Sequence, residues 1–217
     1  MNAAGGSADR WGRERQAAAR RGPWRRVLAW LGLNPAARRA DALAARTALG
    51  AQWEQRTARL LAPLEARGWH ILHDRRLPAP SRANLDHVLV SPCGTAVIVL
   101  DTKRWHAGRP TTLIRGRVCC GGEDRHVQVE KVASYAARVQ KVLGLPVGAV
   151  WPLLVVHGSS VAGLRLEARV GGWAGPVWVL APELLVPTLA SVSGGREDPA
   201  LAARLAVRVG EVLRPYR

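Results

Sequence analysis

Two β-rich runs, at residues 85–90 and 95–100, flank the turn sequence Ser-Pro-Cys-Gly at 91–94. Proline fixes one backbone angle and glycine accepts positive φ, so Pro92 and Gly94 both favour a tight turn. The two runs are therefore predicted to pair as a β-hairpin. This hairpin constrains the fold more than any other segment of the chain.

Each strand of the predicted hairpin delivers a carboxylate. Asp86 lies in the first strand, whereas Asp101 ends the apolar run of the second strand and Lys103 follows two residues later. Side chains alternate along a strand, so Asp101 and Lys103 point the same way and Thr102 points the opposite way. The two carboxylates are expected to converge at the sheet edge or at a fork between the strands. The alternative is a structural ion pair at the rim of the sheet.

Converging carboxylates are the oxygen ligands that Mg²⁺ or Mn²⁺ prefers. Such a cation would polarise a phosphoryl oxygen and lower the pKa of an attacking water. Lys103 would balance the charge that develops on the phosphorus centre. The arrangement is therefore a candidate metal site for cutting phosphodiesters.

The rest of the chain predicts helices on both sides of this hairpin. Apolar residues recur at helical spacing over 40–67, where Pro63 disturbs the last turn and Gly68 ends the helix. Further strands are expected at 69–73, 111–114, 117–120, 150–157 and 176–180, with a loop at 75–83. Further helices are expected at 124–143, 182–190 and 201–213, the first burying Val127, Val132, Tyr135, Val139 and Val142. This order predicts an α/β mixed sheet flanked by helices.

The charge balance favours a polyanionic partner. Lys and Arg number 32 against 16 Asp and Glu, which gives a net charge of +16 and a pI of about 11.5. Nucleic acid is the first expectation and an anionic membrane surface the second. The scarcity of Lys and the absence of Phe also indicate a coding bias that contributes to the arginine excess.

The length of 217 residues suits one catalytic domain with a basic N-terminal extension at 1–39. The amphipathic patch at 23–31 predicts an arm on nucleic acid, a short docking helix or a helix on anionic lipid. Cys93, Cys119 and Cys120 form no CxxC pair and are expected to be free thiols. No run approaches the about 20 apolar residues that cross a bilayer, so a soluble cytoplasmic protein is expected.

Three motifs resemble the nuclease-related domain family, which is similar to the PD-(D/E)XK nucleases of restriction-endonuclease-like fold. They are Asn-Leu-Asp-His at 84–87, the turn at 91–94, and Leu-Asp-Thr-Lys-Arg-Trp at 100–105. The resemblance covers roughly residues 50–156, inside a core domain at 40–160 that residues 161–217 complete. It implies a metal-dependent nuclease that acts on DNA.

The resemblance also implies roles for individual residues. Asp86, Asp101 and Glu54 would hold Mg²⁺ or Mn²⁺, Lys103 would be the catalytic lysine, and Gln128 would lie near the phosphate. Trp105 and Gly108 match the aromatic residue and glycine that follow the lysine. Two departures are visible: Trp53 stands where the family has glycine, and the segment before Asp101 is about two residues longer, an even insertion that preserves the strand face.

Other polar residues have weaker signals. Arg75, Arg76 and Arg82 are plausible phosphate contacts or members of a solvated loop, and Arg104 and Trp105 are proposed near substrate. His87 is interpreted as a packing or supporting residue on the strand face opposite Asp86. The remaining histidines, at 70, 73, 106, 126 and 157, have no metal-ligand spacing and are expected to be ordinary polar or core residues.

Two functions remain open on sequence grounds. The first is a metal-dependent DNA nuclease. The second is a catalytically degenerate nuclease fold that binds nucleic acid or serves as a scaffold, which the altered Trp53-Glu54 motif motivates. Peripheral membrane contact through residues 23–31 is a third and weaker hypothesis.

Overall fold

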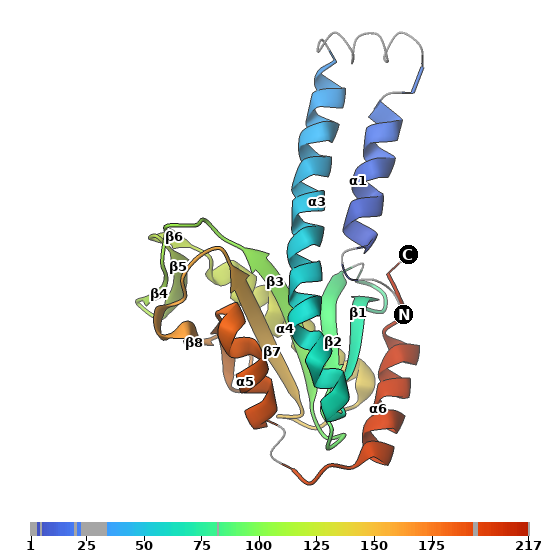
Figure 1. Ribbon diagram of the computed structural model, residues 1–217, viewed down its shortest axis with the longest axis vertical. Helices are drawn as coiled ribbons and strands as arrows, with labels where there is room; N and C mark the ends of the chain where they lie inside the picture. The colour runs from blue at the N-terminus through green and yellow to red at the C-terminus, as the bar shows by residue number, and fades with distance from the viewer. Residues whose placement is uncertain are drawn as a thin grey trace.

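A six-stranded mixed sheet forms the centre of the computed structural model, which describes residues 4, 6–19, 21–22, 34–81, 83–192 and 195–216 (Figure 1). The strand order is β1-β2-β3-β7-β9-β8. The strands are β1 (His70–Arg76), β2 (Asn84–Val90), β3 (Val97–Arg104), β7 (Val150–His157), β8 (Arg165–Arg169) and β9 (Pro176–Leu180). The predicted patch at 23–31 and Arg82 lie outside the described residues.

The predicted hairpin is confirmed as β2 and β3, which pair antiparallel from His87↔Leu100 to Val90↔Val97. Gly94 turns the chain with φ of +69°, and a side chain there would meet the backbone of Ala202 at 2.6 Å. Glycine is therefore required both by the turn and by the close approach of helix α6 (Pro199–Val212). Strand β3 runs on past the expected end at residue 100 and carries Asp101 and Lys103 within it.

Helices cover both faces of the sheet, so the predicted α/β fold is confirmed as restriction-endonuclease-like. Helices α4 (His126–Leu143) and α6 pack on one face, and helices α3 (Pro35–Leu61) and α5 (Pro182–Val192) pack on the other (Figure 1). Alternation along β3 sends Val97 and Val99 to the α4 face, and Ile98 and Leu100 to the α3 face. The same alternation separates the polar residues at the end of β3.

Helix α4 buries Val132 and Val139 as predicted, and Tyr135 packs against the core, but two other predicted positions are exposed. Val127 and Val142 are 65% and 39% exposed. The buried positions are His126, Val129, Val132, Ala133, Ala136, Val139 and Leu143. Small alanines let the helix approach the sheet closely, whereas the prediction had weighted large apolar residues.

Helix α3 is longer than predicted, because Asn34 caps it by accepting hydrogen bonds from the amides of Ala36 and Ala37. Its last residues tighten into a 3₁₀ turn, Ala62–Arg67, which contains Pro63 and ends at left-handed Gly68, as the sequence indicated. Helix α1 (Gly6–Ala19), which was not predicted, packs along the N-terminal half of α3 (Figure 1). The expected extension boundary at residue 39 thus falls within a continuous helix.

The remaining differences lie at the edges. Strand β1 includes Arg75 and Arg76, which were expected in a loop, because they pair with Leu85 and Asn84 of β2. The C-terminal segment adds contacts on the other edge, where Arg76 N donates to Arg214 O. Strand β8 was missed. A small second sheet contains β4 (Thr111–Ile114), β5 (Arg117–Cys120) and β6 (Glu123–Asp124), and a short 3₁₀ turn spans Ala162–Leu164.

Among the residues described, no helix combines the length and apolar character needed to cross a membrane.

Candidate active site

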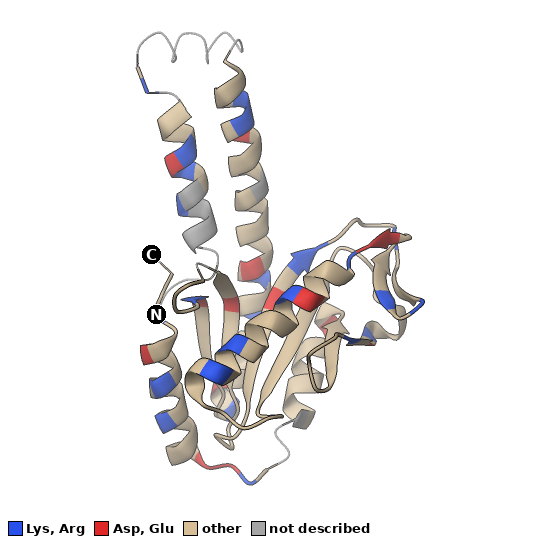
Figure 2. Ribbon diagram, turned by 180° about the vertical axis from the view of Figure 1, so that it is seen from behind, with Lys and Arg blue, Asp and Glu red and all other residues tan. Residues whose placement is uncertain are grey.

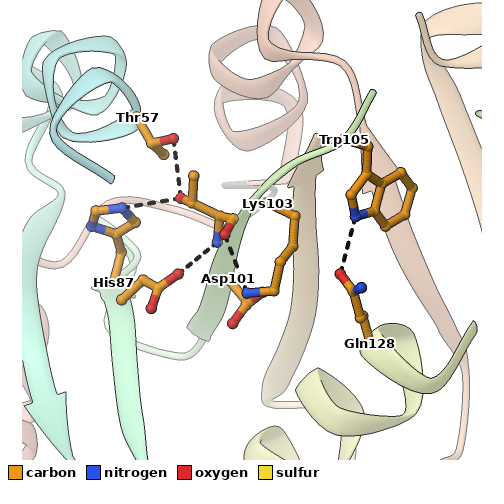
Figure 3. Close-up of polar contacts among 8 residues, drawn as sticks. Thr57, His87, Asp101, Lys103, Trp105 and Gln128 are labelled. Carbon is orange, nitrogen blue, oxygen red and sulfur yellow. Dashed lines mark hydrogen bonds and ion pairs between the residues drawn. The ribbon is translucent and has the colours of Figure 1, made fainter. Parts of the chain in front are cut away.

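The two aspartates meet where β2 and β3 fork. The backbone ladder ends at His87↔Leu100, and beyond it the amide of Thr102 donates to Asp86 Oδ2 at 2.7 Å (Figure 3). A side-chain carboxylate thus replaces a backbone carbonyl as the partner of β3. Asp86 and Asp101 are 9% and 8% exposed, so the fork holds two nearly buried acids on adjacent strands.

Lys103 lies on the same side of β3 as Asp101, as alternation predicted. Its Nζ forms an ion pair with Asp101 Oδ2 and donates to the carbonyl of Thr102 at 3.2 Å (Figure 3). The lysine side chain is 29% exposed, whereas that of Asp101 is 12% exposed. The ammonium group therefore stands between the buried acids and solvent.

Electrostatic coupling links the fork to Glu54 on α3. Burial, then Asp101 and Glu54, raise the pKa of Asp86 well above its ordinary value. Burial and the neighbouring Asp74 raise the pKa of Glu54 to about 7. Burial alone would lower the pKa of Lys103, but the carboxylates of Asp101 and Asp86 outweigh it and raise that pKa. Like charges gathered in a poorly solvated site cost free energy, which a cation can offset.

Asp74 is a buried acid that sequence reasoning missed. It is 2% exposed, has a positive φ of 56° within β1, and accepts a hydrogen bond from Asn84 Nδ2 at 2.7 Å. Its charge contributes to the raised pKa of Glu54. The sequence carried no local signal for it, because a non-glycine residue with positive φ inside a strand is uncommon.

The donor chemistry at the fork fits a hard divalent cation. Asp101 Oδ2 is buried and has no hydrogen-bond partner in the described chain apart from its ion pair with Lys103. Carboxylate oxygens from Asp86 and Asp101 are suitable ligands for Mg²⁺ or Mn²⁺. In the ranges described, however, no three His, Cys, Asp or Glu side chains are grouped as a metal cluster, so Glu54 is not brought together with both aspartates in that way.

Gln128 and Trp105 are brought together on the α4 side. The indole Nε1 of Trp105 donates to Gln128 Oε1 at 3.0 Å (Figure 3). Trp105 is 4% exposed and packs in the core under α4, so its ring holds Gln128 in place and is not presented as a surface platform. Gly108 has a φ of +81° in the turn that follows.

The predicted phosphate contacts are dispersed. Arg104 is exposed at the end of β3, and its Cζ lies 5.7 Å from the centre of the Trp53 ring on α3. Arg76 is exposed at the end of edge strand β1, while Arg75 is half-buried in a hollow that Glu65 and Glu197 also line. The structure therefore brings Arg104 beside the fork and leaves Arg75 and Arg76 on the sheet edge.

A chain of hydrogen bonds lies on the opposite face of β3. Thr102 Oγ1 donates to Thr57 Oγ1 at 3.1 Å, and Thr57 Oγ1 lies 2.8 Å from His157 Nε2. Which of these two atoms donates depends on the tautomer of the His157 ring. Thr57 and His157 were not predicted to take part.

His87 continues this network and faces away from Asp86, as expected. Its Nε2 lies 3.4 Å from Thr102 Oγ1, and its Nδ1 lies 2.8 Å from His73 Nδ1. Burial, then the neighbouring His73 and His157, lower the pKa of His87 well below its ordinary value. The network is thus a buried and uncharged support behind Thr102.

A mixed sheet with helices on both faces, forked acidic strands and a following lysine defines a nuclease-like α/β domain of restriction-endonuclease-like fold. The nuclease-related domain profile matches residues 49–157, just over half of the sequence. The chain belongs to this family, and the resemblance seen in the three motifs is confirmed. Comparisons with curated proteins and with solved structures gave no match.

Proposed function

We propose that this protein is a nuclease that hydrolyses phosphodiester bonds in DNA with Mg²⁺ or Mn²⁺. The observation that carries the proposal is the pair of buried carboxylates at the β2–β3 fork, with Lys103 at its solvent side. Family membership supports a nuclease-related function. The net charge of +16 supports a polyanionic substrate.

Asp86 and Asp101 would hold the cation, with Glu54 as a third carboxylate from α3. When bound, the cation would polarise a phosphoryl oxygen and lower the pKa of the attacking water. Lys103, freed from part of its interaction with Asp101, would balance negative charge on the phosphate in the transition state. Gln128 would orient the phosphate from α4, with its amide oxygen fixed by Trp105.

Basic residues lie on several helices, including α1, α3, α4 and α6 (Figure 2). This distribution supports contact with a phosphate backbone on more than one side of the fork. A cytoplasmic location is also proposed, on the cysteine pattern given by the sequence.

Purified protein should be incubated with linear, circular and branched DNA in Mg²⁺, Mn²⁺ or EDTA, alongside Asp101→Asn. Metal-dependent products that disappear in the variant are expected. The matched control is Asp124→Asn, which removes an exposed carboxylate on the small second sheet and should cleave normally. Full activity of Asp101→Asn would contradict the proposal.

A second candidate is a nucleic-acid-binding protein or scaffold that has lost catalysis. Two observations favour it. Asp101 is occupied by an ion pair with Lys103, and within the described residues Glu54 does not form a metal-binding group with the two aspartates. It predicts salt-sensitive DNA binding that Asp86→Ala leaves unchanged, with no products under any metal. Metal-dependent products would reject it.

A further inference from the structure

A pocket of about 480 Å³ lies on the α3 side of the sheet. Trp53 and Arg56 of α3, His157 at the end of β7 and Glu183 at the start of α5 line it. It thus opens at the carboxyl ends of the parallel strands β3 and β7, where α/β proteins commonly bind ligands. Its volume is within the usual range for ligand sites.

The pocket combines an aromatic plane with the cationic Arg56, and a second cation, Arg104, lies near the same indole. The Cζ atoms of Arg56 and Arg104 lie 5.4 Å and 5.7 Å from the centre of the Trp53 ring. The His157 ring packs against the same indole, with centroids 5.1 Å apart. Both arginines are exposed, and neither forms an ion pair with a carboxylate within the described part of the chain.

This combination suits one chemical class. Stacking on an indole recognises the face of a nucleobase, and guanidinium groups neutralise the adjoining phosphates. The base faces inside a duplex are already stacked on each other, so only an unpaired or flipped nucleotide presents a free face.

The pocket is also connected to the candidate active site along the chain. Trp53 immediately precedes Glu54 on α3, and Arg104 immediately follows Lys103 on β3. Glu54 also interacts electrostatically with Asp101 and Lys103. A nucleotide held against Trp53 would therefore keep its strand near the residues that would act on a phosphate.

We propose that Trp53, Arg56 and Arg104 bind an unpaired nucleotide of a DNA strand whose neighbouring phosphodiester lies at the Asp86–Asp101 fork. This inference rests on the proposed function and assigns single-stranded or branched DNA as its substrate class. The base replaces a guanidinium group over the Trp53 ring, and the two arginines contact the flanking phosphates.

The test is binding of labelled oligonucleotides to the full chain, measured by fluorescence anisotropy in EDTA so that no cleavage occurs. Trp53→Ala is expected to weaken binding of single-stranded DNA by about tenfold. Blunt duplex should be bound as by the unaltered protein. Trp53→Phe, which keeps an aromatic face, should retain most of the single-strand affinity.

Two controls separate stacking from a folding defect. Trp151→Ala changes a half-buried tryptophan at the opposite end of β7 and should leave binding unchanged. The unaltered protein is also tested with a series of oligonucleotides in which one abasic site is moved along the strand. Binding should be weak when the nucleotide that lacks a base occupies the pocket. Melting temperatures show whether each variant is folded.

Equal binding of single strands by folded Trp53→Ala and the unaltered protein, or an equal loss on duplex, would overturn the inference. A free deoxynucleoside monophosphate that competes with the same affinity as the oligonucleotide would show that the pocket binds free nucleotides. That result would also overturn the inference. Cleavage by the unaltered protein and by Asp101→Asn is measured separately and tests only the proposed function. Trp53-dependent binding with no cleavage by any form would refute the nuclease and leave the pocket assignment intact.

Discussion

The two faces of β3 carry opposite kinds of polar chemistry within three residues. Asp101 and Lys103 face α4 and form a charged cluster with Asp86, whereas Thr102 faces α3 and belongs to a neutral hydrogen-bonded network with Thr57 and His87. Strand alternation is enough to keep the two sets apart. On the charged face, buried carboxylates repel each other, and a bound cation would relieve that repulsion. On the neutral face, the polar groups are hydrogen-bonded to each other and fix the backbone between Asp101 and Lys103.

Lys103→Met should have the largest effect, because it removes the cation of the charged face and leaves the neutral face intact. Cleavage is expected to fall by about 10²–10³-fold, the usual cost of losing one stabilising group at a transition state. Single-turnover cleavage rates would measure it. The matched control is Lys131→Met, which removes an exposed lysine from α4. Equal losses of cleavage in both variants would show that only overall charge matters.

The charged cluster, which includes Glu54 of α3, and the neutral network should also respond to pH in opposite directions. Glu54 has its pKa raised to about 7, chiefly by burial, so the stability that it contributes is complete below pH 4.5 and is lost as pH rises through about 7. His157 has its pKa lowered to about 4, chiefly by burial and then by Arg56. Its contribution is complete above pH 6.5 and is lost as pH falls toward 4.

Urea unfolding of Glu54→Gln and His157→Gln, each compared with the unaltered protein at pH 5 and pH 7, separates these contributions. For His157 the linkage amounts to about 2 kcal/mol between the two pH values. Relative to the unaltered protein, Glu54→Gln should gain stability at pH 7 compared with pH 5, and His157→Gln should gain at pH 5 compared with pH 7. The same direction of change in both variants would contradict the contrast between the faces.

Thr102→Val should have the smallest effect, since it removes one hydroxyl from the neutral face. The free energy of unfolding is expected to fall by about 1–2 kcal/mol, because Thr57 and His87 lose a buried partner. Thr102→Ser, which keeps the hydroxyl, should recover most of it. Cleavage should change little, as the amide of Thr102 still donates to Asp86. A loss of cleavage as large as that of Lys103→Met would show that the faces are not independent.

Local sequence rules predicted the hairpin and the side of β3 that each polar residue occupies. Turn chemistry at 91–94 and strand alternation are short-range effects, so they needed no knowledge of the partners. The positions of Glu54 and Gln128 came from family resemblance, since nothing at those positions alone shows that they approach the fork.

The missed features depend on contacts between distant segments. Arg75 and Arg76 belong to a strand because they pair with β2. Asp74 has an unusual backbone angle and interacts electrostatically with Glu54 of a distant helix. Helix α1 depends on small residues that permit close packing: a side chain at Gly12 would meet Thr47 Oγ1 at 2.5 Å. Strand β8 is short and carries charged residues at alternate positions, which weakened its signal.

At the fork, the Thr102 amide donates to the Asp86 carboxylate and not to a backbone carbonyl, so this amide can report on the state of the site. Its hydrogen bond at 2.7 Å ends on the carboxylate of Asp86, whose pKa is raised by burial and then by the charges of Asp101 and Glu54. Deuterium uptake at this amide therefore reflects the occupancy and protonation of the fork, independently of any chemical turnover. A change in uptake on adding Mg²⁺, confined to Thr102 and its neighbours, would register an ion entering the site even in a protein that never cuts a strand.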